Sequence, residues 1–385
     1  MKKDLKDIVL LGPAYPYRGG LAAFIETIAG KFRDQGKKTK IHTFTLQYPS
    51  ILFPGKSQFS ESSPPDNLII LRTINSVNPI NWIRTGMRIK REKPDLLFMK
   101  YWLPLMAPCF GTIARITRKN GHTKVIVQLD NVIPHEKRPF DNLLTRYFIR
   151  SCDGFIYMSR QVKDDLDKFD SSKPSEFAPH PIYDLYGEPM EKNQAKAHLN
   201  LDRDTDYCLF FGFIRDYKGL DILIDAWRLL KDKGITADKK LLVAGEYYGD
   251  KEKYKEQIKV NGLENDIVLY DSFINDEDVK YFFSASSLLV QPYKTATQSG
   301  VTQIAYHFDL PMVVTDVGGL AELIPDDKVG YVTTPDAPHI AVAIEKYFLL
   351  EKENEFRSNL KTEKKRFNWE NMTDKIENLY EKISR

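Results

Sequence analysis

The chain has 385 residues, of which 42% are hydrophobic and 28% charged, and its formal net charge is +3. This length favours two domains over one, and the composition supports buried cores beneath an ordinary charged surface. A net charge this low argues against a dedicated nucleic-acid-binding protein.

We find no sequence signal for export, membrane insertion or a metal site. The first residues place lysines before apolar residues, but the run is too short for a signal peptide. No stretch reaches the roughly 20 apolar residues of a transmembrane helix. The three cysteines, Cys109, Cys152 and Cys208, have neither disulfide nor metal spacing. We therefore expect a reduced, cytoplasmic protein, at most peripheral on the inner face of the membrane.

The first half of the chain alternates short apolar segments with amphipathic ones. Buried parallel strands are typically continuous apolar runs, whereas surface helices have a period of 3.6 residues. We predict strands at residues 8–11, 40–44, 68–71, 96–100, 125–129 and 154–158. We predict helices at residues 21–32, 82–91 and 160–169, the last of them capped by Ser159. This order predicts one βα domain.

The predicted helix at residues 82–91 is strongly basic. Such a face is usually just solvated, but it also contains apolar residues, and together they suit docking on anionic lipid. The residues concerned are Trp82, Ile83, Arg84, Arg88, Lys90 and Arg91.

The second half repeats the same pattern after a polar connector at residues 181–201, so we place the domain boundary after residue 185. This gives domains at residues 1–185 and 186–366, followed by a terminal segment at 367–385. We predict strands at residues 208–214, 240–244, 267–270, 288–290 and 312–315, and helices at 219–230, 300–308 and 372–383.

A polar turn follows the predicted strand at residues 288–290, and Gly300 then begins a helix. Thr297 or Ser299 can cap this helix, which leaves the backbone amides near Gly300 and Val301 unpaired. A helix amino-terminus at the carboxyl edge of a parallel sheet is a common anion site. We therefore predict that this turn binds the phosphates of a nucleoside diphosphate.

Two further turns at the same sheet edge are candidate ligand contacts. Arg215 and Lys218 follow the predicted strand at residues 208–214. Two cations at such an edge favour phosphate binding over a solvated turn. The pair Gly318-Gly319, after the last predicted strand, is either a ligand-facing turn or simply a tight one.

Together these segments resemble a known family. The motifs that carry the resemblance are GFIRDYKG at residues 212–219, GEYYG at 245–249, QPYKTATQSG at 291–300, TDVGG at 315–319, DNVIPHE at 130–136 and DGFIYMSRQVKDDL at 153–166. They are similar to those of the retaining, family-four GT-B glycosyltransferases, often labelled group 1. The resemblance implies two Rossmann-like domains that face each other across a cleft, with the last helix crossing back to the first domain. It also implies a donor site on the second domain and an acceptor site on the first.

The chain departs from this family in three places. Phe213 stands where the family usually has an Arg, and Arg215 comes two residues later. Ala296 and Ile304 occupy the positions of a glutamate pair seven residues apart. Asp130 replaces a histidine that often precedes Asn. Other side chains must therefore contact the ribose or the sugar hydroxyls.

We assign site residues by combining the resemblance with the chemistry of the leaving group. Arg215 and Lys218 would stabilise charge on the diphosphate, and Asp130 would hydrogen-bond the sugar or accept the acceptor proton. The other donor-binding candidates are Gly19, Gly20, Gly212, Phe273, Ile274, Gln298, Ser299, Gly300, Val301 and Gln303. The acceptor-side candidates are Tyr17, Arg18, His135 and Glu136. We expect no metal, and no cofactor besides the donor substrate.

The predicted function is transfer of a sugar from a nucleoside diphosphate sugar to a saccharide or lipid-linked hydroxyl acceptor, in cell-surface polysaccharide, lipopolysaccharide or glycolipid synthesis. Two alternatives share the fold: a nucleotide-sugar 2-epimerase, and a degenerate member that only binds nucleotide or a partner. A two-lobed solute receptor is a third. The run Asp202-Arg203-Asp204 mimics a metal-binding motif of other glycosyltransferases, but it precedes a strand, so we interpret it as a solvated linker.

Overall fold

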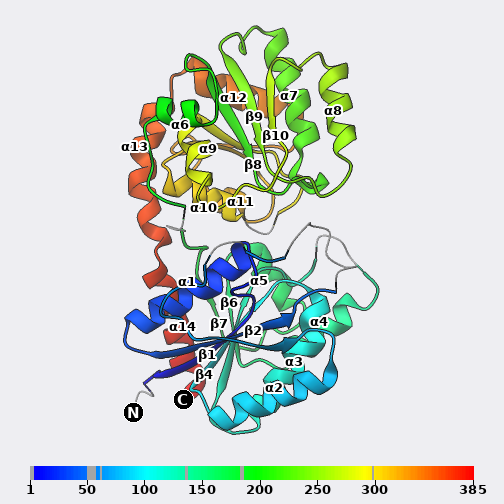
Figure 1. The fold of residues 1–385 in the computed structure, drawn as a ribbon, viewed down its shortest axis with the longest axis vertical. Helices are drawn as coiled ribbons and strands as arrows, with labels where there is room; N and C mark the ends of the chain where they lie inside the picture. Colours follow the sequence, from blue (N-terminus) through cyan, green and yellow to red (C-terminus); the bar gives the residue numbers. More distant parts are fainter. Residues whose placement is uncertain (1–3, 50–57, 61–62, 135–137, 183–185, 297–298) are drawn as a thin grey trace. The chain divides into compact units, whose positions relative to one another are not determined.

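The computed structural model describes residues 4–49, 58–60, 63–134, 138–182, 186–296 and 299–385. The chain divides into two compact units (Figure 1). Unit 1 comprises Met1–Pro179 together with Trp369–Arg385, and unit 2 comprises His180–Asn368. The predicted boundary after residue 185 lies shortly beyond the observed division. Each unit has its own parallel sheet, so the predicted α/β class is confirmed.

The sheet of unit 1 contains seven strands in its described part, in the order β3-β2-β1-β4-β5-β6-β7, and all neighbours are parallel. Its strands are β1 (Asp7–Leu11), β2 (Lys38–Leu46), β3 (Ile70–Asn75), β4 (Leu96–Tyr101), β5 (Lys124–Leu129), β6 (Gly154–Tyr157) and β7 (Ser175–Phe177). Six of these strands were predicted. The third begins later than predicted, and the short β7 was missed.

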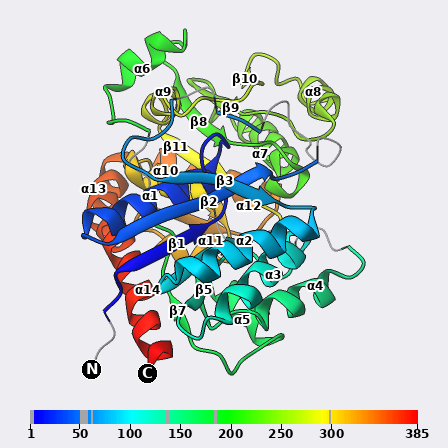
Figure 2. The same ribbon diagram turned by 60° about the horizontal axis from the view of Figure 1, so that its bottom comes forward.

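Helices cover both faces of this sheet (Figure 2). They are α1 (Gly20–Asp34), α2 (Pro79–Glu92), η2 (Pro104–Met106), α3 (Ala107–Arg118), α4 (Asp141–Ile149), α5 (Arg160–Asp167) and α14 (Trp369–Ser384). The connections through α2, α3, α4 and α5 all run in one direction across the sheet, whereas the connection through α1 runs in the other. Because parallel crossovers are right-handed, α2 to α5 lie on one face and α1 on the opposite face.

The terminal helix α14 packs on unit 1 beside α1 and along β5, β6 and β7. The ring of Trp369, its first residue, lies 5.3 Å from the ring of Phe24 in α1. Gly154 in β6 leaves room for Leu379, whose side chain would lie 3.2 Å from a Cβ at that position. The last segment therefore completes the first unit, as the family resemblance implied.

The sheet of unit 2 contains six parallel strands in its described part, in the order β10-β9-β8-β11-β12-β13. Its strands are β8 (Asp206–Phe211), β9 (Lys239–Ala244), β10 (Ile267–Tyr270), β11 (Leu288–Gln291), β12 (Met312–Thr315) and β13 (Gly330–Thr333). Its helices are α6 (Lys192–His198), η3 (Asp216–Lys218), α7 (Leu220–Asp232), α8 (Lys251–Val260), α9 (Val279–Ala285), α10 (Gly300–His307), α11 (Leu320–Leu323), α12 (Ala337–Leu349), α13 (Glu353–Glu363) and η4 (Lys364–Phe367).

Alternate residues of each central strand of unit 2 enter different cores. In β8, Leu209 packs in the core beneath α9 and α10, and Phe210 packs in the core beneath α7 and α12. Burial on both faces explains why these strands read as continuous apolar runs.

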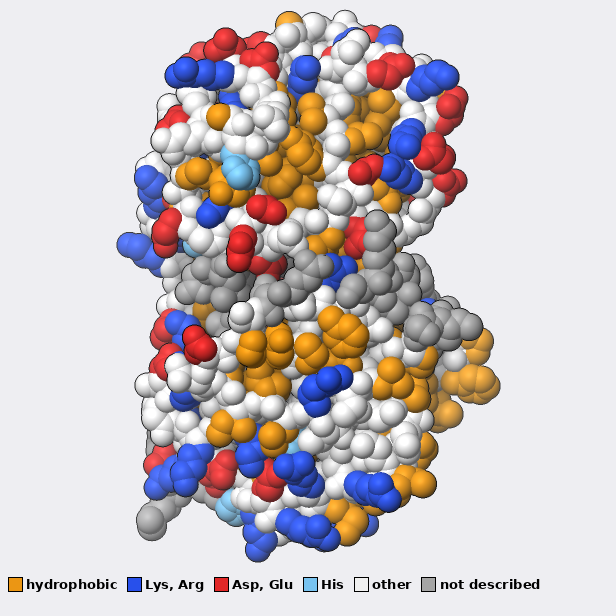
Figure 3. Space-filling view, in the orientation of Figure 1, with side chains coloured by type: hydrophobic (Ala, Val, Ile, Leu, Met, Phe, Trp, Pro, Cys, Tyr) orange, Lys and Arg blue, Asp and Glu red, His pale blue; other side chains and the backbone are white. Residues whose placement is uncertain are grey.

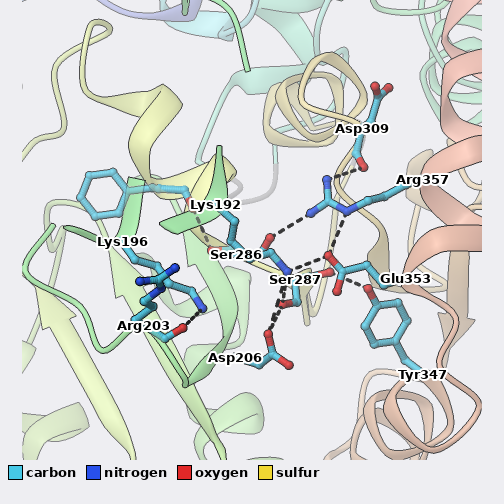
Figure 4. Close-up of polar contacts among 11 residues, drawn as sticks. Lys192, Lys196, Arg203, Asp206, Ser286, Ser287, Asp309, Tyr347, Glu353 and Arg357 are labelled. Carbon is cyan, nitrogen blue, oxygen red and sulfur yellow. Dashed lines mark hydrogen bonds and ion pairs between the residues drawn. The ribbon is translucent and has the colours of Figure 1, made fainter. Parts of the chain in front are cut away.

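A polar network closes the amino edge of this sheet (Figure 4). Lys192 Nζ lies 3.0 Å from Ser287 Oγ and 2.8 Å from Glu353 Oε1, and Arg357 Nε donates to the same Glu353 oxygen at 3.0 Å. Ser287 Oγ also donates to Asp206 Oδ1 at 2.8 Å. The network ties α6 and α13 to the starts of β8 and β11, which fixes the frame of unit 2 at the edge opposite the predicted turns.

Among the described residues we find no helix that has both the length and the apolar character needed to cross a membrane.

Candidate active site

The strand order of unit 2 reverses between β8 and β11. The chain leaves β8 toward β9 on one side and leaves β11 toward β12 on the other. The turns after these two strands therefore separate at the carboxyl edge, which is where doubly wound sheets bind ligands. In the described part of the chain these turns are residues 212–219, 292–296 and 299, which belong to the two segments in which the sequence predicted phosphate contacts.

The two turns are joined directly. The backbone N–H of Lys294 donates to Tyr217 O at 2.7 Å, and Lys294 Nζ contacts Asp216 at 3.1 Å and Asp221 at 2.8 Å. Gly219 has φ +71, and a Cβ there would lie 2.0 Å from Pro292 O. Only glycine permits this approach, so the backbone fixes one turn against the other.

Lys218 is the central cation of this arrangement. Its side chain is buried, at 8% exposure, and its Nζ lies 5.5 Å from the centroid of the Tyr293 ring. A Cβ on Gly212 would lie 3.0 Å from Lys218 Nζ and 3.5 Å from Val301 Cγ2. The ammonium, the glycine after β8 and the first turn of α10 therefore converge at one point.

No carboxylate among the described residues pairs with Lys218. Asp216, on the same turn, instead contacts Lys294 and Lys253. A buried charge is costly unless a partner of opposite charge compensates it. The site therefore suits an anion beside Lys218 and the start of α10.

The other cation of the turn lies toward a different strand. The guanidinium of Arg215 lies 5.0 Å from the ring centroid of Tyr248, in the loop after β9. Phe213 contacts the same Tyr248 ring, with centroids 4.7 Å apart, and lies 6.1 Å from Phe273 after β10. Arg215 and Lys218 thus occupy opposite sides of β8. The sequence motif GEYYG contained Tyr248, but its part in this aromatic group was not predicted.

The start of α10 is held by a residue that the sequence analysis missed. Gln291 Nε2 donates to Ser299 Oγ at 2.7 Å, and Gln291 Oε1 accepts from Thr302 Oγ1 at 2.8 Å. The predicted cap by Ser299 is wrong, because its side chain makes no capping hydrogen bond and faces Gln291 instead. Thr297, the other predicted cap, lies outside the described residues. A polar residue at the end of the apolar run LLVQ was the available signal.

The other predicted donor contacts differ in their burial. Gly300 is partly exposed, and no atom lies within 4 Å of a Cβ built on it. Ile274 packs partly buried against the core beneath α10. Gln303 is fully buried and neither of its amide atoms has a hydrogen-bond partner, so its side chain is not presented at the surface. Gln298 lies outside the described residues.

The third predicted turn, at Gly318-Gly319, lies at the same edge of the sheet. Gly318 has φ +52, the left-handed region that glycine adopts easily. Thr315, at the end of β12, donates from Oγ1 to Tyr293 O at 2.6 Å. The turn after β12 is thereby connected to the turn after β11.

In unit 1, the glycine loop after β1 leads directly into α1. Gly19 has φ +95 and precedes Gly20, the first residue of the helix, and no atom lies within 4 Å of a Cβ on either. The acceptor-side candidate Tyr17 is instead part of the core, at 4% exposure, with its ring 6.1 Å from Phe44. Burial raises the pKa of its phenol. The backbone of Arg18 donates to Gln58 O at 3.1 Å.

Asp130 follows β5 and is buried beside a lysine that we did not predict. Lys100 Nζ lies 2.8 Å from Asp130 Oδ1 and 2.6 Å from Gln128 Oε1, and Gln128 Nε2 donates to the same Asp130 oxygen at 2.9 Å. The ammonium also lies 3.8 Å from the ring centroid of Phe24. Burial lowers the pKa of Lys100, and the Asp130 carboxylate opposes this shift. His135 and Glu136 lie outside the described residues.

No cluster of three or more His, Cys, Asp or Glu side chains suited to a metal occurs in the described part of the chain. The Asp202-Arg203-Asp204 run lies at the amino end of β8, at the edge of the sheet opposite the turns (Figure 4). There Lys196 Nζ donates to Arg203 O at 2.9 Å, and the Asp204 N–H donates to Asp202 Oδ1 at 2.8 Å.

Comparisons with known proteins point to glycosyltransferases. Residues 205–349 match the family model described as glycosyl transferases group 1. The chain is 25% identical to an uncharacterised glycosyltransferase of Methanocaldococcus jannaschii, over 96% of both chains. It is 27% identical to the lipopolysaccharide core biosynthesis mannosyltransferase of Rhizobium meliloti, over 50% of this chain and 54% of that protein. Unit 2 therefore contains a group 1 glycosyltransferase domain, and the whole chain resembles glycosyltransferases.

Solved structures of glycosyltransferases share its fold. HepE of Anabaena, solved in complex with UDP and glucose, superimposes with a TM-score of 0.72 and 16% identity, covering 96% of this chain and 98% of that one. The segment of this chain that matches the family model, residues 205–349, contains all three turns of unit 2 described above. The GT-B fold that the sequence motifs indicated is therefore confirmed.

Proposed function

We propose that this glycosyltransferase moves a sugar from a nucleoside diphosphate sugar to a hydroxyl acceptor, with retention of configuration and without a metal. The observation that carries the proposal is Lys218, a largely buried lysine whose ammonium lies beside Gly212 and the first turn of α10 and has no carboxylate partner among the described residues. A diphosphate supplies the missing negative charge.

The diphosphate leaves with growing negative charge on its oxygens, so the main catalytic task is to stabilise that charge. Lys218 would donate to one phosphate, and the amides of Gly300 and Val301 would donate with the dipole of α10 behind them. Arg215 lies on the other side of β8 and would meet the second phosphate or the transferred sugar. These groups supply cationic and dipolar stabilisation from the chain itself.

The aromatic group of Phe213, Tyr248 and Phe273 would hold the nucleobase. Its members follow β8, β9 and β10, the strands on one side of the switch point. Aromatic rings stack on the π-face of any base, and this set therefore gives affinity without choosing the base. The solved complex of the Anabaena protein with UDP supports a nucleoside diphosphate at a fold of this kind.

Asp130 of unit 1 would hydrogen-bond the transferred sugar or accept the proton of the acceptor hydroxyl. Its Oδ1 already receives hydrogen bonds from Lys100 and Gln128, which orient the carboxylate. Gly19 and Gly20 would let a ligand approach the start of α1 closely. The acceptor is a saccharide or a lipid-linked sugar of a cell-surface polysaccharide, lipopolysaccharide or glycolipid, a proposal that the Rhizobium meliloti mannosyltransferase supports.

The test is a donor screen with the full chain. UDP-, GDP-, ADP- and dTDP-linked sugars are incubated with the protein, and release of free nucleotide is measured with and without simple saccharide acceptors. We expect the protein to release nucleotide from donors that share one nucleobase. The product should have the same anomeric configuration as the donor. Release with the opposite anomer would contradict retention.

A second candidate is a member that binds nucleotide without transfer. Ala296 and Ile304, which stand at the positions of the usual glutamate pair, are buried and apolar, at 7% and 6% exposure. Tight calorimetric binding of a nucleoside diphosphate, with no nucleotide release from any donor, would establish this candidate and overturn transfer.

A further inference from the structure

Helix α2 of unit 1 exposes an apolar stripe. Ile80, Ile83 and Met87 are 62%, 47% and 42% exposed, and their spacing places them on one side of the helix. Val77, just before the helix, is 48% exposed. Trp82, which the sequence analysis placed on a docking face, points the other way, because its Nε1 donates to Asn75 O at 2.7 Å. The stripe therefore consists of aliphatic side chains.

The same part of the chain concentrates positive charge. Residues 77–150 contain 14 Lys and Arg and 5 Asp and Glu, a net charge of +9, whereas the whole chain carries +3. The rest of the protein is consequently acidic, at −6. Within residues 77–134 and 138–150, no Asp or Glu side chain is exposed. The exposed cations there are Arg84, Arg88, Arg91, Lys93, Arg115, Arg118, Lys119, Arg138, Arg146 and Arg150.

These cations lie on α2, α3 and α4 and in the segments beside them, and Arg118 pairs with Asp153. Helices α2, α3 and α4 lie side by side on the same face of the sheet (Figure 2). Hydrophobic and Lys or Arg side chains alternate over this region of unit 1 (Figure 3). On α2, Arg88 pairs with Glu92, but Arg84 and Arg91 have no acidic partner among the described residues. At the other end of the layer, Phe140 and Leu143 are 75% and 64% exposed.

We propose that the α2–α4 face of unit 1 docks on an anionic lipid bilayer. The stripe Ile80, Ile83 and Met87 would enter the headgroup and acyl boundary, and the surrounding cations would contact lipid phosphates. An amphipathic helix whose apolar side is flanked by Arg and Lys has this chemistry. The inference goes beyond the proposed function, because it concerns where the enzyme works and requires no substrate.

Two other partners fit the face less well. A nucleic acid would use the cations but has no counterpart for a stripe of aliphatic side chains. A second copy of this chain would bring two faces rich in Arg and Lys together, which is unfavourable. Lipid alone matches both the charge and the apolar stripe.

The experiment is sedimentation of the full chain with two kinds of vesicle, phosphatidylcholine alone and phosphatidylcholine with about 30% phosphatidylglycerol. One variant is the pair Ile83→Ser and Met87→Ser, and another is the pair Arg84→Gln and Arg91→Gln. The matched control is Val342→Ser with Leu349→Ser, which removes exposed aliphatic side chains from α12 of unit 2 (55% and 63% exposed).

We expect at least tenfold more binding to the anionic vesicles, and a loss of that binding in 0.5 M salt. The serine pair on α2 should reduce binding at least fivefold, the glutamine pair should reduce it and flatten its salt dependence, and the α12 control should bind normally. Equal binding to both vesicles, or normal binding by both α2 variants, would overturn the proposal. It would also be overturned by RNA binding that the serine pair leaves intact, or by a dimer that the serine pair dissociates.

Discussion

Lys100 Nζ lies 2.8 Å from Asp130 Oδ1, across two neighbouring strands of unit 1, and both residues are largely buried. The same ammonium lies over the ring of Phe24, which in turn packs against Trp369 at the start of the terminal helix. A buried lysine paired with a buried carboxylate costs stability that an apolar pair would not. We interpret Lys100 as a positioning residue that orients the Asp130 carboxylate.

Lys100→Met should lower kcat at least tenfold and change the KM for the donor by less than about twofold. The reason is that Asp130 Oδ1 loses one of the two hydrogen-bond donors that orient it. The variant should also lose stability, by about 3–5 kcal/mol, because Asp130 is left without its cation. The measurements are kcat, KM and the Tm.

The matched control is Lys196→Met in unit 2. Lys196 is also buried, at 4% exposure, but its Nζ donates to Arg203 O at the amino edge of the sheet. This variant should change the Tm and leave kcat unchanged. If Lys100→Met also leaves kcat unchanged, Lys100 is only a structural residue.

The hydrogen bond between Gln291 and Ser299 gives a prediction about the start of α10. Gln291→Leu should cost about 1–3 kcal/mol and weaken nucleotide binding, because Ser299 and Thr302 lose their buried partner. Ser299→Ala should cost about 1 kcal/mol and should not add fully to Gln291→Leu, since both changes remove one shared bond. Fully additive unfolding free energies in the double variant would restore the capping role that the sequence suggested.

His42 gives a prediction about acid stability. Burial lowers its pKa to about 4, and its Nδ1 lies 2.9 Å from Thr73 Oγ1. Below the usual His value near 6.5 the unfolded chain binds the proton first, so stability rises with pH between about 4 and 6.5. His42→Leu should remove this part of the pH dependence, on the order of 2–3 kcal/mol, in urea unfolding at pH 4.5 and pH 7. Parallel pH curves for the two proteins would contradict the prediction.

A further prediction is that transfer does not depend on a metal ion. The proposed donor site provides Arg215, Lys218 and helix amides for the diphosphate, and these are the kinds of group that replace a bridging cation. Transfer should therefore survive 5–10 mM EDTA, a concentration we take as about tenfold above any carried-over divalent metal. Activity that EDTA abolishes and Mg²⁺ restores would reopen the role of Asp202 and Asp204.

The sequence predicted the parts of the fold that depend on local pattern. Strands such as β10 and β12 were predicted to the residue, because burial on both faces produces continuous apolar runs. Among the described elements, two strands, β7 and β13, and eight helices were not predicted; the helices are α3, α4, α6, α8, α9, α11, α12 and α13. Several of these elements are brief or have apolar residues on several sides. Element type was readable where the segment was long or strongly periodic.

The site was predictable only in part, for a different reason. The turns containing Lys218 and Gly300 could be located, because both follow a strand and precede a helix. Lys100 with Asp130, and Gln291 with Ser299, are pairs between side chains that no local pattern connects. The donor contact predicted for Gln303 requires an outward side chain, whereas the structure buries it. Pairing across strands is set by tertiary packing and therefore escaped the sequence.

Calorimetric titration tests directly whether Lys218 binds the donor diphosphate. UDP, GDP and ADP are titrated into the unmodified protein, and the tightest of them is then titrated into Lys218→Ala and into the control Lys233→Ala. Lys233 lies at the other end of α7 and pairs with Glu345.

A charge-assisted bond is worth about 1.5–3 kcal/mol, so Lys218→Ala should bind the nucleotide at least tenfold more weakly. Its Tm should change little, because Lys218 has no carboxylate partner among the described residues that the change would leave unpaired. Lys233→Ala should bind like the unmodified protein. If Lys218→Ala binds the nucleoside diphosphate with unchanged affinity, the diphosphate is not held at this turn and the account of the donor site is wrong.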